Sequence, residues 1–451
     1  MELQMAFGTV SSPHIFDVGS DVPKEITDKK VGVSREFAPK CLDDLIPVGQ
    51  KDVVKRYCKE YRDLCARTGV RLAEESDGPN KCFGVMREGE VLGIHYDLDK
   101  WMWSVPRAKT LRLTEEISEA LQKKEATVEL LERIKGKIIH YEPVIPTGKW
   151  QRSWILAQTS EELPKSRIVK LSRVTCWQLE WWRTALLICM EGSKIPDPRG
   201  WAKMEGVHIH SDAAGGGTST SGFGSVTMGD PDWGPVGWSH GKWPGWLNRR
   251  EGSRTLGVKF DLKLTTLEGF AALVALASSH KEVRGKTCYL HVDNSGFVYG
   301  AKKGSSKCLF AASVIKACHD VAQGLGTKLV VMKEARCSSL GAEAADAFSK
   351  SDMERAKAQF GKRMQGWRRK TPETLERWIQ DPVPDPELGF RVLSELAGSE
   401  ENFPWGQPRL DREDLVAGAQ ELNISKRKRK WKEGKKEEKK SGNRRKRRRR
   451  R

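Results

Sequence analysis

Apolar and polar positions alternate most regularly between residues 207 and 350, in the order strand, strand, strand, helix, strand, helix, strand, helix. Five short apolar runs bounded by turn residues predict strands at 207–214, 222–228, 258–262, 288–293 and 328–333. Three longer segments with apolar residues at helical spacing predict helices at 266–280, 309–325 and 343–350. Strands interleaved with helices are typical of the α/β class, in which helices cover a mixed sheet.

The first 145 residues have a different pattern, which predicts short strands and loops followed by helix. Between Arg107 and Lys137, leucine and isoleucine recur at helical spacing, and this predicts two helices. Residues 150–198 are rich in tryptophan, including Trp177 and the adjacent Trp181 and Trp182. We interpret this connector as a helix that packs its aromatic rings into a core.

Residues 351–424 read as a mixed extension, in which the proline-rich stretch 382–386 separates two helical pieces. Proline lacks a backbone N–H and fixes its own φ angle, so such a stretch interrupts a helix. The extension carries no motif that indicates a function.

The positive charge is concentrated at the carboxyl end. The chain has a formal net charge of +19, and residues 426–451 hold 18 Lys and Arg against 3 Glu, a net +15. Blocks of like charge repel one another and stay disordered, and dense lysine and arginine bind phosphate chains by releasing counterions. Six residues represent this expected nucleic-acid-binding segment: Lys426, Arg427, Lys428, Arg429, Arg444 and Arg445.

The same basic runs are also typical of nuclear import signals, so an import receptor is an expected partner and the nucleus the expected location, otherwise the cytoplasm. A solvated tail without a role is the alternative. The ten cysteines include no Cys-x-x-Cys pair, which disfavours a zinc ribbon or disulfide framework and favours a reducing compartment. No segment approaches the roughly 20 apolar residues of a membrane span, and no secretory leader is recognisable, so no membrane partner is expected.

Four acids occupy positions that this α/β pattern would bring together. Asp212 and Asp293 end predicted strands, where ligands gather in open α/β sheets, and Glu268 and Asp346 lie in otherwise apolar helices. Clustered carboxylates raise one another's pKa values unless cations neutralise them. An all-oxygen ligand set suits Mg²⁺ or Mn²⁺, and two such ions can cleave a phosphodiester. For any one acid alone, a solvated strand end or helix start is the better interpretation.

Two histidines precede these acids by two positions, His210 before Asp212 and His291 before Asp293. Because side chains alternate along a strand, each histidine shares a face with its aspartate. A zinc site is one interpretation of the pair. Hydrogen-bonded core histidines are preferred, since the sequence offers no further nitrogen or sulfur ligand nearby.

In order and spacing the acids resemble the RNase H superfamily. The matching motifs are Ser211-Asp212-Ala213-Ala214, Thr266-Leu267-Glu268, Val292-Asp293-Asn294 and Ala345-Asp346-Ala347-Phe348-Ser349-Lys350. The resemblance implies a mixed five-stranded sheet with flanking helices. It also implies that Asp212, Glu268, Asp293 and Asp346 hold two Mg²⁺ or Mn²⁺ ions and that the RNA strand of an RNA/DNA hybrid is cut. RNA would be recognised through its 2′-hydroxyl groups.

The sequence departs from that family at two places. Ala342 stands where Asn is common, and the loop between Lys333 and Gly341 contains no histidine. The missing histidine implies slower release of product without loss of cleavage.

The amino-terminal region resembles the end of a reverse transcriptase. Phe7-Gly8 followed by small residues and Pro13 is similar to a palm motif, and Cys41-Leu42-Asp43-Asp44 to the Tyr-x-Asp-Asp turn. Asp43 and Asp44 would then be a metal-binding pair, and Val91-Leu92-Gly93 would match the primer grip. The first aspartate of the chain is Asp17, so the upstream strand aspartate and the fingers are missing. The chain alone is not expected to polymerise DNA.

The resemblance as a whole is to a retroelement polyprotein, most similar to DIRS-type elements through Leu179-Glu180-Trp181-Trp182 and the motifs around Asp212 and Glu268. It implies a partial palm at 1–105, thumb helices at 106–145, a connection at 146–205 and an RNase H-like domain at 206–352. An extension at 353–424 and a disordered basic tail at 425–451 follow.

The expected function is a metal-dependent endoribonuclease attached to a truncated reverse transcriptase. One alternative is a catalytically inactive or domesticated nucleic-acid-binding remnant, against which the retention of all four acids argues. Another is a polymerase subunit that a second chain completes. No pattern in the sequence indicates an oligomeric state.

Overall fold

The computed structural model describes residues 12–41, 44–72, 85–145, 148–158, 163–195, 206–215, 221–228, 235–248, 260–304, 306, 308–336, 338–360, 367–397 and 413. The chain forms two units, Met1–Gly89 with Tyr96–Lys100, and Glu90–His95 with Trp101–Arg451. Helices and strands are both present, which confirms the α/β class. None of the helices in these ranges has the length and apolar character that a membrane crossing requires.

The smaller unit contains two helices that the sequence pattern did not predict. Its elements are α1 (Ser12–Val31), a 3-10 turn at Arg35–Phe37, β1 (Lys40–Cys41), β2 (Asp44–Leu45) and α2 (Lys51–Thr68). Tyr57 is fully buried, and its hydroxyl donates to Asp28 Oδ1 at 2.7 Å, which joins the two helices. The expectation of short strands and loops agrees with β1 and β2 but was wrong for α1 and α2. In α2, Val54, Tyr57, Tyr61 and Cys65 do recur at helical spacing.

The segment from residue 88 to residue 194, which precedes the large sheet in the chain, is mainly helical. Its strands are β3 (Glu88–Val91), β4 (Ile94–Asp97), β5 (Met102–Ser104), β6 (Glu125–Thr127), β7 (Ile168–Lys170) and β8 (Ser193–Lys194). Its helices are α3 (Arg107–Lys123), α4 (Val128–Tyr141), α5 (Ser153–Gln158) and α6 (Arg173–Ile188), with 3-10 turns at Gly148–Trp150 and Cys189–Glu191. The two helices predicted between Arg107 and Lys137 are α3 and α4, and Lys124 ends the first in the left-handed region (φ 52°).

Helix α6 confirms the interpretation of the tryptophan-rich connector. Trp177, Trp181 and Trp182 are all buried, and Trp182 Nε1 donates to the Gln151 carbonyl at 2.8 Å. A Cβ atom on Gly148 would lie 2.8 Å from Trp182 Cζ2, so this ring also needs a glycine beside it. Burying the large aromatic surface and satisfying the indole N–H together hold α6 in its core.

Among the described residues, the large sheet has six strands in the order β13-β12-β9-β10-β11-β14, one more than the five predicted. They are β9 (Gly206–Ala213), β10 (Gly222–Met228), β11 (Pro235–Lys242), β12 (Thr287–Val292), β13 (Lys328–Lys333) and β14 (Trp367–Arg368). Strand β9 pairs antiparallel with β10 and parallel with β12, and β12 pairs parallel with β13, so the sheet is mixed.

Helices cover this sheet, and in the chain they lie between its strands and after the last of them. They are α8 (Gly245–Asn248), α10 (Phe260–Ser278), α11 (His280–Val283), α12 (Ser295–Lys303), α13 (Leu309–Gly324), α14 (Leu340–Ser349), α15 (Met353–Phe360), α16 (Glu373–Gln380) and α17 (Leu388–Ala397). The strand predicted at 258–262 was wrong, because α10 begins at Phe260 and the third strand is β11. The sequence of β11, Pro-Val-Gly-Trp-Ser-His-Gly-Lys, is poor in β-branched residues and so gives a weak strand signal.

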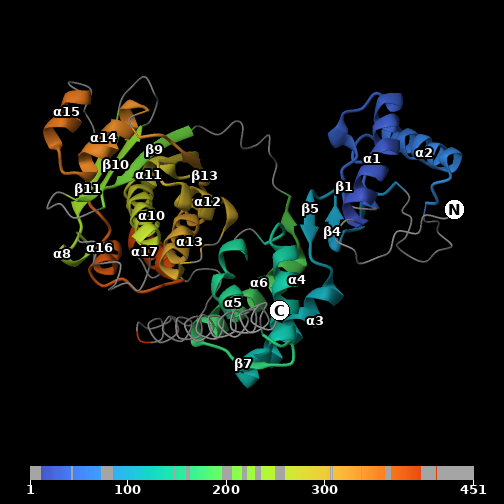
Figure 1. Cartoon of the computed structure of the whole chain (residues 1–451), viewed down its shortest axis with the longest axis horizontal. Coiled ribbons are helices and arrows are strands. Elements are labelled where there is room, and N and C mark those ends of the chain that lie inside the picture. Colours follow the sequence, from blue (N-terminus) through green and yellow to red (C-terminus); the bar gives the residue numbers. More distant parts are fainter. Residues whose placement is uncertain are drawn as a thin grey trace, which may run out of the picture. The chain divides into compact units, whose positions relative to one another are not determined.

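The two faces of the sheet carry different helices (Figure 1). Ile209 and Val292 pack with α10 and α13 in the main hydrophobic core. On the opposite face Val226, the cross-strand partner of His210, packs with Phe348 of α14. The main core also includes Trp378 of α16 and other side chains of α17, so part of the predicted extension contributes to it. Helices α16 and α17 are the two helical pieces expected around residues 382–386.

Gly224 of β10 sets how closely α14 approaches the sheet. A Cβ atom there would lie 2.5 Å from the Ala345 carbonyl oxygen and 2.6 Å from Phe348 Cβ. We expect Gly224→Ala to displace α14 and to lower the free energy of unfolding by about 1–3 kcal/mol, as overpacking usually does. Urea denaturation measures this. Gly136→Ala is the control, since nothing lies within 4 Å of that position in α4. Equal effects of the two substitutions would contradict the packing account.

Candidate metal centre

Three of the four predicted acids meet at one end of the sheet. Asp212 lies on β9, Asp293 directly follows β12, and Glu268 lies on α10. One carboxylate oxygen from each lies within 4.8 Å of the others. The approach follows from the parallel pairing of β9 and β12, which brings their carboxyl ends to the same edge. The expectation that these acids cluster is confirmed.

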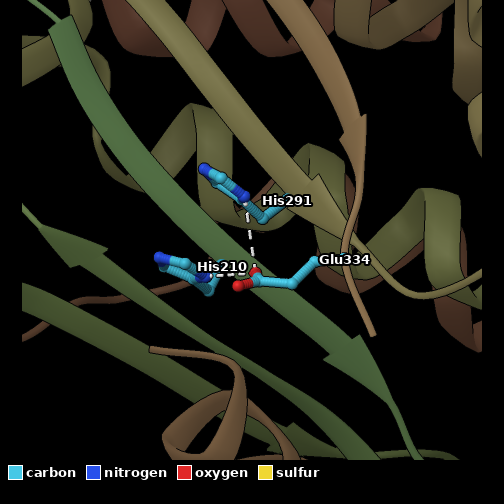
Figure 2. A group of neighbouring side chains, drawn as sticks. All are labelled: His210, His291 and Glu334. Atoms are coloured by element: carbon cyan, nitrogen blue, oxygen red, sulfur yellow. Dashed lines mark hydrogen bonds and ion pairs between the residues drawn. The ribbon is translucent and has the colours of Figure 1, made fainter. Parts of the chain in front are cut away.

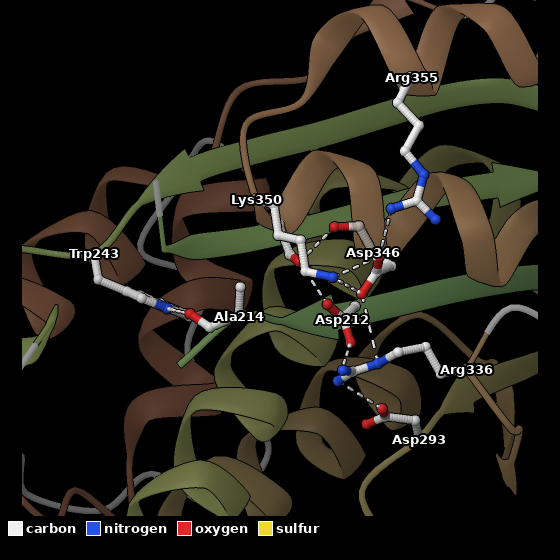
Figure 3. A network of polar contacts seen from close by, with 9 residues as sticks. Asp212, Ala214, Trp243, Asp293, Arg336, Asp346, Lys350 and Arg355 are labelled. Carbon is white, nitrogen blue, oxygen red and sulfur yellow. Dashed lines mark hydrogen bonds and ion pairs between the residues drawn. The ribbon is translucent and has the colours of Figure 1, made fainter. Parts of the chain in front are cut away.

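Asp346, the fourth acid, reaches the cluster through an arginine (Figure 3). Arg336 Nη2 lies 3.1 Å from Asp293 Oδ2 and 3.8 Å from Asp212 Oδ1, and Arg336 Nε lies 3.5 Å from Asp346 Oδ1. Lys350 Nζ also contacts both Asp346 oxygens, at 2.7 and 2.8 Å. The protein's own cations therefore bridge the carboxylates.

Arg336 was missed by the sequence analysis, which looked for a histidine in the loop between β13 and α14. Its side chain is 54% exposed, so it can leave the acids without disturbing a core. Burial acts to lower the pKa of Arg336, but the charges of Asp212, Asp293 and Asp346 outweigh it and raise the pKa. The Arg336 guanidinium therefore remains positively charged beside the three acids.

Burial makes the cluster costly to ionise. It raises the pKa of Asp212, against a hydrogen bond of 2.5 Å that the Ser349 hydroxyl donates to Asp212 Oδ2. It raises the pKa of Glu268 well above its ordinary value, and the charges of Asp212 and Asp293 add to the effect. Glu268 Oε2 is buried and has no hydrogen-bond partner among the described residues. A buried carboxylate oxygen without a donor fits a hard divalent cation such as Mg²⁺ or Mn²⁺.

The space beside the acids is small. A cavity of about 20 Å³ is lined by His210, Ser211, Asp212, His291, Val292, Asp293, Glu334, Ala335, Arg336 and Ala342. That volume holds about one water molecule. Arg336 lies beside this cavity in contact with Asp212 and Asp293, so a phosphate group that approaches these acids meets its guanidinium.

His210 and His291 are hydrogen-bonded, as the preferred interpretation held. His210 Nδ1 lies 2.7 Å from Glu334 Oε2, and His291 Nε2 lies 3.0 Å from His208 Nδ1. Burial lowers the pKa of His291 to about 4. Glu334 was missed, because the search along the sequence considered nitrogen and sulfur ligands and Glu334 supplies oxygen. Glu334 directly follows β13, the third of the parallel strands. An acid at the carboxyl end of a predicted parallel strand is the sequence signal that indicates this residue.

The remaining predicted site residues lie in the smaller unit and the tail. Cys41 and Asp44 pair across the β1–β2 hairpin, while Asp43 and the side chain of Asp44 lie outside the described residues. Phe7 and Gly8 lie outside them as well. So do all six tail residues: Lys426, Arg427, Lys428, Arg429, Arg444 and Arg445.

The predicted primer-grip turn falls between β3 and β4. Leu92 and Gly93 both have positive φ angles, 48° and 79°, as a type I′ hairpin turn requires.

Neither a scan against protein-family models nor a search of curated proteins finds a match to this chain.

Proposed function

We propose that the chain is a metal-dependent endoribonuclease of the RNase H type that cuts the RNA strand of RNA/DNA hybrids. The observation that carries the proposal is the meeting of Asp212, Glu268 and Asp293 within 4.8 Å at the carboxyl ends of two parallel strands. The order of these acids along the chain, with Asp346 in a later helix on the opposite side of Arg336, supports it.

Each residue of the site has a separate role in this proposal. Asp212, Glu268 and Asp293 would hold the cations, and Asp346 would complete the set from α14. Two bound divalent ions supply activation of the attacking water and charge stabilisation of the leaving oxygen. Arg336, once displaced from the carboxylates, binds the backbone phosphate of the substrate, because a guanidinium matches phosphate in charge and geometry. Ser349 keeps Asp212 oriented through its hydrogen bond.

The substrate class is an RNA/DNA hybrid, in line with the resemblance to RNase H. The basic tail adds affinity for nucleic acid of any sequence, since its charge acts through counterion release. Import into the nucleus is a second proposed use of the same charges.

For the smaller unit we propose an origin in a reverse transcriptase palm within a retroelement polyprotein. The β1–β2 hairpin between Cys41 and Asp44, preceded by α1, supports it. The turn at Leu92 and Gly93, which belongs to the larger unit, is consistent with the primer-grip resemblance. No polymerase activity is proposed for this chain alone.

A second candidate is a nucleic-acid-binding remnant that does not cut. The contacts of Arg336 and Lys350 with the acids favour it, because the protein's own cations already neutralise the cluster. The two candidates differ in their response to Mg²⁺.

Cleavage of a labelled RNA/DNA hybrid by the full chain tests the proposal. We expect cutting of the RNA strand in Mg²⁺ or Mn²⁺, none in EDTA, and a loss on the order of 10³-fold in Asp293→Asn, because a removed ligand charge takes away several kcal/mol. Asp63→Asn, an exposed acid of α2, is the control. Salt-sensitive binding without cleavage in either metal would replace the nuclease by the binding remnant.

A further inference from the structure

A ladder of aromatic rings leads along the sheet toward the acids. In the parallel pairing of β9 and β12, His210 lies opposite His291, and His208 opposite Tyr289. The His210 and His291 rings stack with centroids 4.4 Å apart and 16° between their planes. The His208 ring stacks on Tyr289 at 4.9 Å. Two imidazoles are thereby held face to face at fixed orientation.

A carboxylate from the third parallel strand completes the group (Figure 2). Glu334 Oε2 lies 2.7 Å from His210 Nδ1 and 3.4 Å from His291 Nδ1. The Glu334 backbone N–H donates to the Val292 carbonyl at 3.1 Å, which fixes the residue beside the end of β12. One ring nitrogen of each histidine and one Glu334 carboxylate oxygen lie within 4.8 Å of one another.

We propose that His210, His291 and Glu334 form a binding site for one divalent transition-metal ion, best fitted by Zn²⁺. Two imidazole nitrogens and one carboxylate oxygen are a known zinc ligand set, and three protein ligands leave a fourth position for water. Ligand atoms around tetrahedral zinc lie roughly 3.3 Å apart, from bond lengths of about 2.0–2.2 Å. The 3.4 Å contact has this spacing, and the 2.7 Å contact reaches it when Glu334 shifts by about half an ångström. Because imidazole binds a metal in its ring plane, the two stacked rings must also turn toward each other when the ion binds.

The surroundings orient each ligand. His291 uses Nδ1 toward Glu334 and has His208 Nδ1 at 3.0 Å from its Nε2, so Nε2–H can donate there and leave Nδ1 unprotonated for the metal. Ser338 Oγ donates to Glu334 Oε1 at 3.2 Å, on the side away from the histidines. A Cβ atom on Gly341 would lie 2.6 Å from His210 Nε2, so α14 closes over that ring. Metal sites generally depend on such outer contacts.

This site differs from the acid cluster in ligand chemistry and position. Nitrogen ligands select transition ions, whereas the carboxylates of Asp212, Glu268 and Asp293 select Mg²⁺ or Mn²⁺. The histidines precede Asp212 and Asp293 by two residues, a rise of roughly 6.6 Å along the strands. The three proposed ligands line the same cavity as Asp212 and Asp293, and Glu334 lies two residues before Arg336. An ion here fixes the start of the loop that carries Arg336. The proposal does not depend on nuclease activity.

Titration of the full chain with Co²⁺, as a spectroscopic substitute for Zn²⁺, tests the site. Excess Mg²⁺ is present throughout to occupy the acid cluster. We expect one equivalent of Co²⁺ to give visible absorption typical of low coordination number, and Zn²⁺ to displace it. His291→Ala and Glu334→Gln are expected to lose this signal, and His208→Ala to weaken binding about 10–100-fold as an outer contact. His140→Ala, an exposed histidine of α4, is the control.

Two results would overturn the proposal. One is unchanged Co²⁺ binding in His291→Ala and Glu334→Gln, which would place the ion elsewhere. The other is no binding that survives excess Mg²⁺, which would leave a hydrogen-bonded cluster without metal. Because the variants could lose their fold, circular dichroism in EDTA accompanies them. Long-range ¹⁵N spectra of the unaltered protein supply a measurement without variants, since Zn²⁺ must shift the Nδ1 signals of two histidines.

Discussion

Glu268→Gln is expected to lower hybrid cleavage on the order of 10³-fold and, at neutral pH without metal, to raise the melting temperature. Burial raises the pKa of Glu268 well above its ordinary value, so at pH values between the unfolded and the folded pKa the folded state retains a proton that the unfolded chain has released. Stability conferred by the protonated form is present at low pH and falls as pH rises toward the folded pKa, by about 1.4 kcal/mol per pH unit. Glutamine cannot ionise, so Glu268→Gln does not lose stability in this way as pH rises.

Thermal unfolding in EDTA and in Mg²⁺ measures the effect. Mg²⁺ is expected to raise the melting temperature of the unaltered chain, because a ligand that binds the folded state stabilises it, and to raise that of Glu268→Gln much less. Glu376→Gln, an exposed acid of α16, controls for the loss of one negative charge. The same response to Mg²⁺ in all three proteins would separate Glu268 from cation binding and contradict the prediction.

The cluster of three acids was predictable because it depends on features that the sequence carries. Asp212 and Asp293 follow apolar runs whose order implies parallel neighbours, and Glu268 follows the start of an apolar helix. The same reasoning placed β13 correctly and located α13 to within one residue. Short-range periodicity and strand order are sufficient for such positions.

Arg336 and Glu334 were not predictable by the same route. Both lie in a loop after β13, and no periodicity fixes where loop side chains point. Their contacts depend on tertiary packing, since Glu334 is held by the Val292 carbonyl and Arg336 by charges from three separate elements. Strand β11 was missed for a different reason. Its pairing with β10, from Gly222↔Lys242 to Met228↔Pro235, outweighs a weak local propensity.

His319→Phe is expected to make the chain less sensitive to acid. His319 lies on α13, and its ring stacks on Trp150 with centroids 3.8 Å apart. Burial, together with the charge of Lys149, lowers the pKa of His319 to about 3. In the unfolded chain a histidine titrates near 6.5. Between these values the unfolded state binds one more proton than the folded state, so stability is present above pH 6.5 and is lost as pH falls toward 3.

The expected size follows from that single proton. The free energy of unfolding should decrease by about 1.4 kcal/mol for each pH unit between roughly 6 and 4 on account of His319 alone. Phenylalanine keeps a flat ring against Trp150 but cannot be protonated, so the slope should decrease by that amount. Urea denaturation at a series of pH values measures it. Burial raises the pKa of Asp320, which has the opposite sign, but this group is present in both proteins and cancels in the difference.

His140→Phe is the matched control, because it replaces a histidine that is exposed on α4 and leaves His319 in place. We expect its slope to equal that of the unaltered chain. Identical slopes for His319→Phe and the unaltered chain would mean that His319 is protonated in the folded state over this range. The stacking on Trp150 would then accommodate a charged ring, as a cation over an aromatic face can be stabilised. If the free energy of unfolding depends less steeply on pH in His319→Phe but not in His140→Phe, His319 is a determinant of acid unfolding. The reason is that the folded core holds the His319 ring in its neutral form.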